Sequence, residues 1–405
     1  MPIIERVSAR RLWDGRGRPT LEAEVWLRSG AVGRAVAGSP TRGIGGAAQL
    51  RDGGPAFGGA GVQAAITAIR EDIAEALHGL DCRDQETIDR AMIAADGTPD
   101  KSRLGGNALH AVSLAVARAR AAHAGEPLWK HLAGGAEPER MPLPVIEVLG
   151  QAPALAGTRG PAGVASVGVV ATGAETLAMA LDWSAEVVRA LDAALAHHGA
   201  RLGGSRGGGF VSPFDDPAEA LDTVTRAIAK AGFAPGEDVG IALDVGAGAF
   251  GGGGRYVLGP DGAGLDAPGM NVHLLEWLGR FPIAVIEDPL APDGGAAWPA
   301  LTRAAGAGVA VVGGDLLASD GRRVRVAAEA GACNAIRVEP ADAGTLTEAK
   351  AAVVAARAAG WRLMLSCGAG TGGDTWPAEL AVAWGADLVR AGGLVDGAPG
   401  LNELI

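Results

Sequence analysis

The feature that most constrains the fold is a repeated texture in the last two thirds of the chain, where short β-branched runs alternate with alanine-rich stretches of helical spacing. This is the pattern of parallel strands joined by crossover helices. Seven such strands over about 260 residues favour a closed α/β barrel over an open, doubly wound sheet. The predicted strands are residues 164–171, 239–245, 283–286, 309–312, 334–338, 363–366 and 388–390.

The start of the chain has a different pattern. Residues 20–27 alternate between apolar and polar side chains, a turn follows at 28–30, and a second strand is predicted over 31–37. Apolar residues then recur at helical spacing over 62–77 and 107–124. Strands followed by helices indicate an α+β domain.

Two glycines and a proline, Gly134, Gly135 and Pro138, mark a boundary after these helices. We therefore expect an N-terminal α+β domain over residues 1–135 and a barrel domain over residues 136–405.

Composition limits the partners and the compartment. The net charge is −11, and no basic stripe with interleaved aromatic residues occurs, so a nucleic-acid partner is not expected. No apolar run has the length of a membrane span and the N-terminus lacks the apolar core of a signal peptide, so we expect a cytoplasmic protein with no membrane partner. The three cysteines are far apart, which excludes a disulfide framework.

Carboxylates follow three successive predicted strands. Asp244 ends the first, Glu287 and Asp288 end the second, and Asp315 follows the third. In a barrel, the C-terminal ends of the strands carry the chemistry. Converging carboxylates are the oxygen ligands that Mg²⁺ prefers, whereas the alternative is that they are helix caps and loop residues.

Several motifs then resemble the enolase family, in family order and over nearly the whole chain. The resemblance implies an N-terminal α+β capping domain on an atypical eight-stranded α/β barrel, assembled as a homodimer. It also implies the Mg²⁺-dependent dehydration of 2-phosphoglycerate to phosphoenolpyruvate. The matching motifs are DGRGRPTLEAEV (14–25), QLRDGG (49–54), DGTPDKSRLGGNALHAVSLA (96–115), MPLPV (141–145), IALDV (241–245), FPIAVIEDPL (281–290), VVGGDLLASD (311–320) and GTLTEA (344–349).

The residues that would carry this reaction have changed. The family's base is a lysine on a barrel strand, and the match places Glu339 there. The acid-side glutamates correspond to the stretches 165–168 and 204–208, which contain no carboxylate. The loop of the family's active-site histidine corresponds to 150–157, which contains no histidine.

The substrate-binding positions have changed as well. The family's phosphate-binding stretch corresponds to 367–371, without its cationic anchors, and a second substrate-binding lysine corresponds to Arg390, which keeps the charge but not the shape. The mobile serine loop corresponds to 38–46, in which Ser39 or Thr41 is a loose substitute. Ser366 is a third candidate for contact with a substrate.

The family's metal triad is kept in part. Asp244 and Glu287 match two ligands, whereas the third corresponds to Gly314, with Asp315 one position later. Because neighbouring strand residues point to opposite faces, Asp315 replaces the lost ligand only if a bulge or the end of the strand turns it inward. We therefore expect Mg²⁺ binding that is weak or absent.

Two functions follow from this pattern. The leading hypothesis is an enolase homologue without the usual dehydratase activity, serving as a pseudoenzyme, a partner protein or a binding protein for a small carboxylic acid. The alternative is a Mg²⁺-dependent lyase or isomerase of the enolase superfamily. In that case Glu339 would remove a proton beside the carboxylate of a different substrate.

Overall fold

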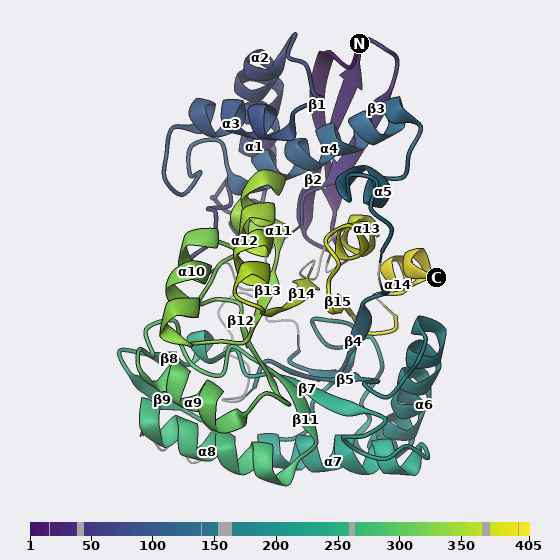
Figure 1. The fold of residues 1–405 in the computed structure, drawn as a ribbon, viewed down its shortest axis with the longest axis vertical. Helices are drawn as coiled ribbons and strands as arrows, with labels where there is room; N and C mark the ends of the chain where they lie inside the picture. The colour runs from purple at the N-terminus through teal and green to yellow at the C-terminus, as the bar shows by residue number, and fades with distance from the viewer. Residues whose placement is uncertain are drawn as a thin grey trace.

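The structure is a computed structural model of the chain (Figure 1). It describes residues 1–15, 17–38, 44–138, 140–152, 164–258, 264–366, 373–395 and 397–405. Two of the candidate residues, Ser39 and Thr41, lie outside the described residues, and so does the stretch 367–371 that corresponds to the family's phosphate-binding segment.

The chain begins with a three-stranded antiparallel sheet in the order β1-β2-β3. Helix α4 packs across β2 and β3. The approach is close at Gly33 of β3, where a Cβ atom would lie 2.0 Å from the carbonyl oxygen of Ala115, so only glycine allows this packing. The strands are β1 (Ile4–Trp13), β2 (Pro19–Leu27) and β3 (Val32–Val36), and the α-helices are α1 (Gln63–Ala68), α2 (Ala74–Leu77), α3 (Gln85–Asp96), α4 (Gly106–Ala124) and α5 (Leu128–Leu132).

A closed barrel of eight strands follows, which confirms the barrel and excludes the open sheet. Pairing of β15 with β4 closes it, and a short strand, β6 (Phe210–Val211), adds to β4. The barrel strands are β4 (Leu143–Gly150), β5 (Ser166–Val170), β7 (Gly240–Asp244), β11 (Ile283–Glu287), β12 (Ala310–Gly313), β13 (Ala335–Val338), β14 (Arg362–Ser366) and β15 (Leu388–Gly392).

All seven predicted strands are present, with two differences from the expected pattern. The first strand of the barrel, β4, was not among those read from the β-branched runs. In addition, β5 runs antiparallel to both of its neighbours, β4 and β7, whereas the other pairs in the ring are parallel. A run of β-branched residues has no direction, so the sequence pattern alone could not reveal this reversal.

Helices cover the outside of the barrel (Figure 1). No helix of the described residues is long and apolar enough to cross a membrane. In the barrel domain, the described helices of eight residues or more are α6 (Leu177–Leu195), α7 (Pro217–Lys230), α8 (Ala267–Arg280), α9 (Ala297–Ala305), α10 (Gly321–Ala330), α12 (Leu346–Ala358) and α13 (Trp376–Ala383); the short ones are α11 (Pro340–Ala343) and α14 (Ala398–Leu404). A small antiparallel sheet precedes α8 and consists of β8 (Gly251–Gly252), β9 (Arg255–Val257) and β10 (Gly264–Asp266).

The inside of the barrel is filled by a separate apolar cluster, to which seven of the strands contribute one residue each and β12 two. Its members are Val145, Val170, Ala242, Val285, Ala310, Val312, Ala335, Met364 and Leu388. Side chains alternate between the two faces of a strand, so the residue two positions further along also points into the barrel. The apolar layer is therefore followed, toward the C-terminal end of the barrel, by a second layer of inward-facing residues.

Candidate functional site

The second layer is polar and lies where the sequence analysis expected the site. Counting two residues on from the apolar layer leads to Glu147 on β4, Asp244 on β7, Glu287 on β11, Arg337 on β13 and Arg390 on β15. The register sets Asp244 directly beside Glu287 on one side and beside Ser166 of the reversed strand β5 on the other. Three carboxylates and two arginines therefore lie in one layer, at one end of the barrel, because each is two positions beyond the apolar layer on its strand.

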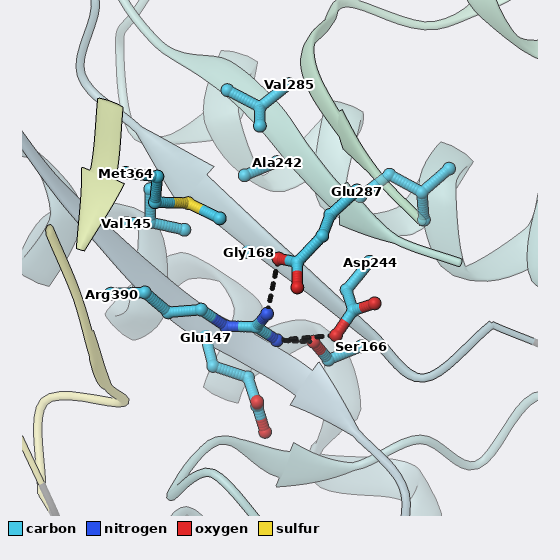
Figure 2. Close-up of a pocket in the computed structure, with 11 residues that line it drawn as sticks. Val145, Glu147, Ser166, Gly168, Ala242, Asp244, Val285, Glu287, Met364 and Arg390 are labelled. Atoms are coloured by element: carbon cyan, nitrogen blue, oxygen red, sulfur yellow. Dashed lines mark hydrogen bonds and ion pairs between the residues drawn. The ribbon is translucent and has the colours of Figure 1, made fainter. Parts of the chain in front are cut away.

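Arg390 lies between two of the predicted metal ligands (Figure 2). Its Nη1 donates to Glu287 Oε2 at 2.6 Å, and its Nη2 donates to Asp244 Oδ2 at 2.8 Å. The same Nη2 donates to Ser166 Oγ at 2.9 Å. One guanidinium therefore connects side chains from three neighbouring strands.

Arg337 contacts several carboxylates on the other side of Glu287, and its side chain is almost completely buried. Its Nη1 donates to Glu287 Oε1 at 3.1 Å, while its Nη2 lies 3.3 Å from Asp342 Oδ2 and 3.5 Å from Asp315 Oδ1. Glu339 Oε2 is 3.8 Å from the same nitrogen. Both carboxylate oxygens of Glu287 thus face a guanidinium, one from each arginine.

Burial and charge act in opposite directions on these groups. Burial alone would lower the pKa of Arg390, but the attraction of Glu287 and Asp244 outweighs it and holds the pKa above its usual value. The same balance raises the pKa of Arg337, whose main partner is again Glu287. For Glu287, burial raises the pKa and the two arginines only partly oppose it. Both arginines therefore stay charged at any physiological pH.

Glu147 is a further buried acid of this layer that the sequence analysis did not select. Its Oε1 accepts hydrogen bonds from Ser205 Oγ at 2.6 Å and from the Gly207 amide at 3.2 Å. A Cβ at Gly150 or Gly207 would lie 2.3 Å or 2.1 Å from its carboxylate oxygens, so a side chain at either position would displace the carboxylate. Burial raises the pKa of Glu147, which favours the protonated form.

The turn after β12 explains where Asp315 goes. Asp288 accepts hydrogen bonds from the amides of Gly314 and Asp315 at 2.8 and 2.9 Å, and it fixes this turn from the end of β11. The end of the strand thereby directs the Asp315 carboxylate inward, to Arg337. At Gly314, the position of the lost ligand, a Cβ would lie 2.9 Å from Arg337 Cζ and 2.7 Å from Asp288 Oδ2. Asp288 and Arg337 together thus occupy the space that a side chain at 314 would need.

Glu339 and Ser366 complete the candidate residues. Glu339 is fully buried, its main chain is bound on both sides by Ser319 Oγ, and its carboxylate faces Arg337. Ser366 ends β14, is buried, and lies beside Arg390 in the strand register. The structure therefore brings together Asp244, Glu287, Asp315, Glu339 and Arg390, with Ser366 at their edge.

The space left within this layer is small. The cavity lined by Glu147, Ser166, Asp244, Glu287 and Arg390 has a volume of about 10 Å³, which is the room of about one water molecule. All four lysines and all seven histidines belong to the described residues, and none lies on a barrel strand. The titratable groups in this cavity are thus three carboxylates and one arginine.

Comparison with protein-family models decides the relationship. The model of the enolase N-terminal domain matches residues 4–132, and the model of the enolase C-terminal TIM barrel domain matches residues 139–401. The chain belongs to the enolase family. This confirms the resemblance seen in the motifs, and it confirms the fold expected from it, an N-terminal enolase domain followed by a TIM barrel.

The enolase family generally uses Mg²⁺, so the donor atoms must be compared with what this ion requires. Mg²⁺ needs oxygen ligands close to octahedral geometry. Here both Glu287 oxygens and Asp244 Oδ2 already accept hydrogen bonds from arginine. Among the described residues, no group of three or more His, Cys, Asp and Glu side chains could hold a metal ion. The residues present do not fit the ion as they are arranged.

Sequence reasoning selected the carboxylates and Arg390 but missed two members of the layer. Neither Arg337 nor Glu147 was among the candidates. Both stand in strands that are otherwise apolar, IRV and LPVIEVLG, and a charged residue inside a fully buried strand was the signal that could have found them.

Proposed function

We propose that this chain is an enolase-family protein that does not dehydrate 2-phosphoglycerate and acts through binding, of a small carboxylic acid or of a partner protein. The observation that carries the proposal is the position of Glu339. It stands where the family has its base, yet it is fully buried and its carboxylate faces Arg337. A general base must reach the proton that it removes, and this one is directed at an arginine.

The surrounding groups support the same conclusion. Glu287 is paired with two permanently charged arginines, Arg337 and Arg390. The cavity beside Glu287 admits about one water molecule. A proton next to a carboxylate is removed only with strong stabilisation of the resulting charge, which the family obtains from Mg²⁺. We propose that Mg²⁺ binding by this chain is weak or absent. The Mg²⁺-dependent lyase with Glu339 as its base is therefore the less favoured function.

The test is an absorbance assay for phosphoenolpyruvate, with 2-phosphoglycerate, millimolar Mg²⁺ and an active enolase as positive control. We expect no turnover above background. A rate within a hundredfold of the median enzyme value of about 10 s⁻¹ would show that the matching of residues to the family is wrong. The variant Glu339→Lys restores the family's residue type alone, and we expect it to stay inactive because Arg337 and Arg390 are still in place.

Binding is tested separately from turnover. The thermal midpoint of the chain is measured with 2-phosphoglycerate, phosphoenolpyruvate and a panel of small carboxylic acids, each without Mg²⁺. A ligand at a hundred times its dissociation constant adds about 2.7 kcal/mol to the free energy of unfolding, which is easily measured. No shift with any acid would favour a protein partner over a small-molecule ligand.

A further inference from the structure

The Arg390 guanidinium has the contacts of a bound cation. Its two terminal nitrogens reach oxygens of Glu287, Asp244 and Ser166, from three successive strands of the barrel, at 2.6 to 2.9 Å. Two of these three side chains, Asp244 and Glu287, are those that match metal ligands of the family. The planar donor arrangement of the Arg390 guanidinium suits carboxylates, and the charge of the guanidinium is permanent.

We propose that the Arg390 guanidinium is a built-in substitute for the family's divalent cation, and that this side chain is what keeps Mg²⁺ out of the barrel. The inference deepens the proposed function, on which it rests for the weak binding of Mg²⁺, by naming the residue responsible. It also makes a positive claim: removing one arginine creates a metal site from carboxylates that are already present.

A second observation, independent of Arg390, supports this substitution. The third ligand of the family corresponds to Gly314, and the space for a side chain there is filled by Asp288 and Arg337, with Oδ2 2.7 Å and Cζ 2.9 Å from the position of a Cβ. The same arginine neutralises the second oxygen of Glu287 and approaches Asp315. The lost ligand and the gained positive charge thus occupy the same place.

Electrostatics explains why the ion and the arginines exclude one another. The family has a charged lysine at the position of Arg390, so the difference is the planar guanidinium, which reaches Asp244 and Glu287 at once, together with the second charge of the buried Arg337. A divalent cation beside these carboxylates would lie near both guanidiniums, and charges of the same sign repel where little water screens them. Without Arg390, one positive charge is gone, and Asp244 and one oxygen of Glu287 lose the arginine that they share. Oxygens of Asp244 and Glu287, with water, then become available to a hard cation, whereas Asp315 still faces Arg337.

The experiment compares the parent chain with Arg390→Met, using Mn²⁺ as the probe and the electron paramagnetic resonance of free Mn²⁺ as the readout. At about 1 mM Mn²⁺ we expect the parent to show no binding that Mg²⁺ can displace. Arg390→Met should have one Mn²⁺ site, with an affinity at least tenfold higher than this 1 mM limit for the parent. Mg²⁺ should compete for that site. Adding Asp244→Asn to Arg390→Met should abolish it, whereas the surface control Arg226→Met should behave as the parent does.

Three outcomes would overturn the inference. The first is a parent chain that binds Mn²⁺ below about 1 mM in competition with Mg²⁺. The second is a folded Arg390→Met that gains no site, and the third is a gained site that survives Asp244→Asn. If Arg390→Met folds only when Mg²⁺ is added, the metal has replaced the arginine and the inference is supported. If it does not fold at all, the parent titration decides.

Failure of this inference and failure of the proposed function are distinguishable. A folded Arg390→Met that gains no site, beside a parent chain that neither binds Mg²⁺ nor produces phosphoenolpyruvate, contradicts the inference alone. A parent chain that binds Mg²⁺ contradicts the weak binding on which both rest. A parent chain that produces phosphoenolpyruvate contradicts the proposed function, whatever its affinity for Mn²⁺.

Discussion

The polar second layer of the barrel is its mouth, formed by Glu147, Asp244, Glu287, Arg337 and Arg390. The mouth and the junction between the N-terminal domain and the barrel are both buried and polar, but they are built differently. At the junction, the buried carboxylate of Asp89 on α3 is paired with neutral donors: it accepts from both the amide and the hydroxyl of Thr347 at 3.0 and 2.6 Å. Ion pairs of Arg118 with Asp374 and of Lys101 with Glu348 also cross the junction. Close by, the amide of Leu346 donates to Ser113 Oγ at 3.0 Å. In the mouth, carboxylates face arginines.

The difference follows what the sequence has kept. Ser113 and Thr347 lie within segments that match the family motifs, whereas Arg337 and Glu339 stand where the matched catalytic strand has changed. On the proposed function, residues that join the two domains are retained, while those that would perform chemistry are replaced by groups that neutralise one another. The proposed function thus implies that the mouth is a structural element, and its contribution to stability is measurable.

The largest effect is expected from Arg337→Met. The change removes a buried cation that faces Glu287, Asp315, Glu339 and Asp342, and breaking a buried ion pair on one side costs about 3–5 kcal/mol. We expect urea denaturation to show a loss of this size. The control Arg226→Met removes an exposed arginine that pairs with Asp222 on α7 and should change the free energy of unfolding by less than about 1 kcal/mol. Equal losses in the two variants would contradict a structural role for the mouth.

At the junction, His110 of α4 predicts a dependence on pH. Its ring is fully buried against Trp376 and neither ring nitrogen has a hydrogen-bond partner among the described residues. Burial lowers its pKa to about 4, and the charge of Asp374, which is shared with Arg118, only partly opposes this. The folded state therefore binds fewer protons than the unfolded state between pH 6.5 and pH 4.

The corresponding loss of stability on acidification is about 3 kcal/mol, since one pKa unit is worth about 1.4 kcal/mol. It is fully absent above pH 6.5 and grows as the pH falls toward 4. The free energy of unfolding is measured by denaturation at several pH values for the parent and for His110→Leu. In the variant, the part of the pH dependence that comes from His110 should vanish, while the part that comes from the carboxylates remains. Parallel slopes for parent and variant would show that the ring is protonated in the folded state.

The sequence predicted the barrel well because its evidence is local. Each strand is a short β-branched run between helices, and seven of the eight were found in this way. The reversal of β5 was missed, because direction is set by pairing between distant segments. In the mouth, residue types located Asp244, Glu287 and Arg390, but their partners depend on which side chains share a layer. The members of that layer can be identified only once the register of the paired strands is known, as the contacts of Arg337 and Glu147 show.

A smaller effect is expected from Gly314→Ala. A Cβ at this position would lie 2.7 Å from Asp288 Oδ2 and 2.9 Å from Arg337 Cζ, closer than real Cβ atoms approach other atoms. Such overpacking typically costs about 1–3 kcal/mol. The control Gly279→Ala, on α8, meets no atom within 4 Å and should stabilise the helix by about 0.5–1 kcal/mol. Thermal and urea denaturation should therefore give opposite signs for the two changes.

The smallest expected effect concerns how Gly314 and Arg337 depend on each other. If Arg337 fills the space of a side chain at 314, then Gly314→Ala should cost less in an Arg337→Met background, where the flexible thioether can move aside. A double-mutant cycle should give a coupling of about 0.5–1 kcal/mol, whereas residues that do not share space give additive changes. Additivity would mean that Asp288, not Arg337, determines the need for glycine. The turn after β11 would then be the reason for the missing ligand, and the arginine would have entered a space that was already empty.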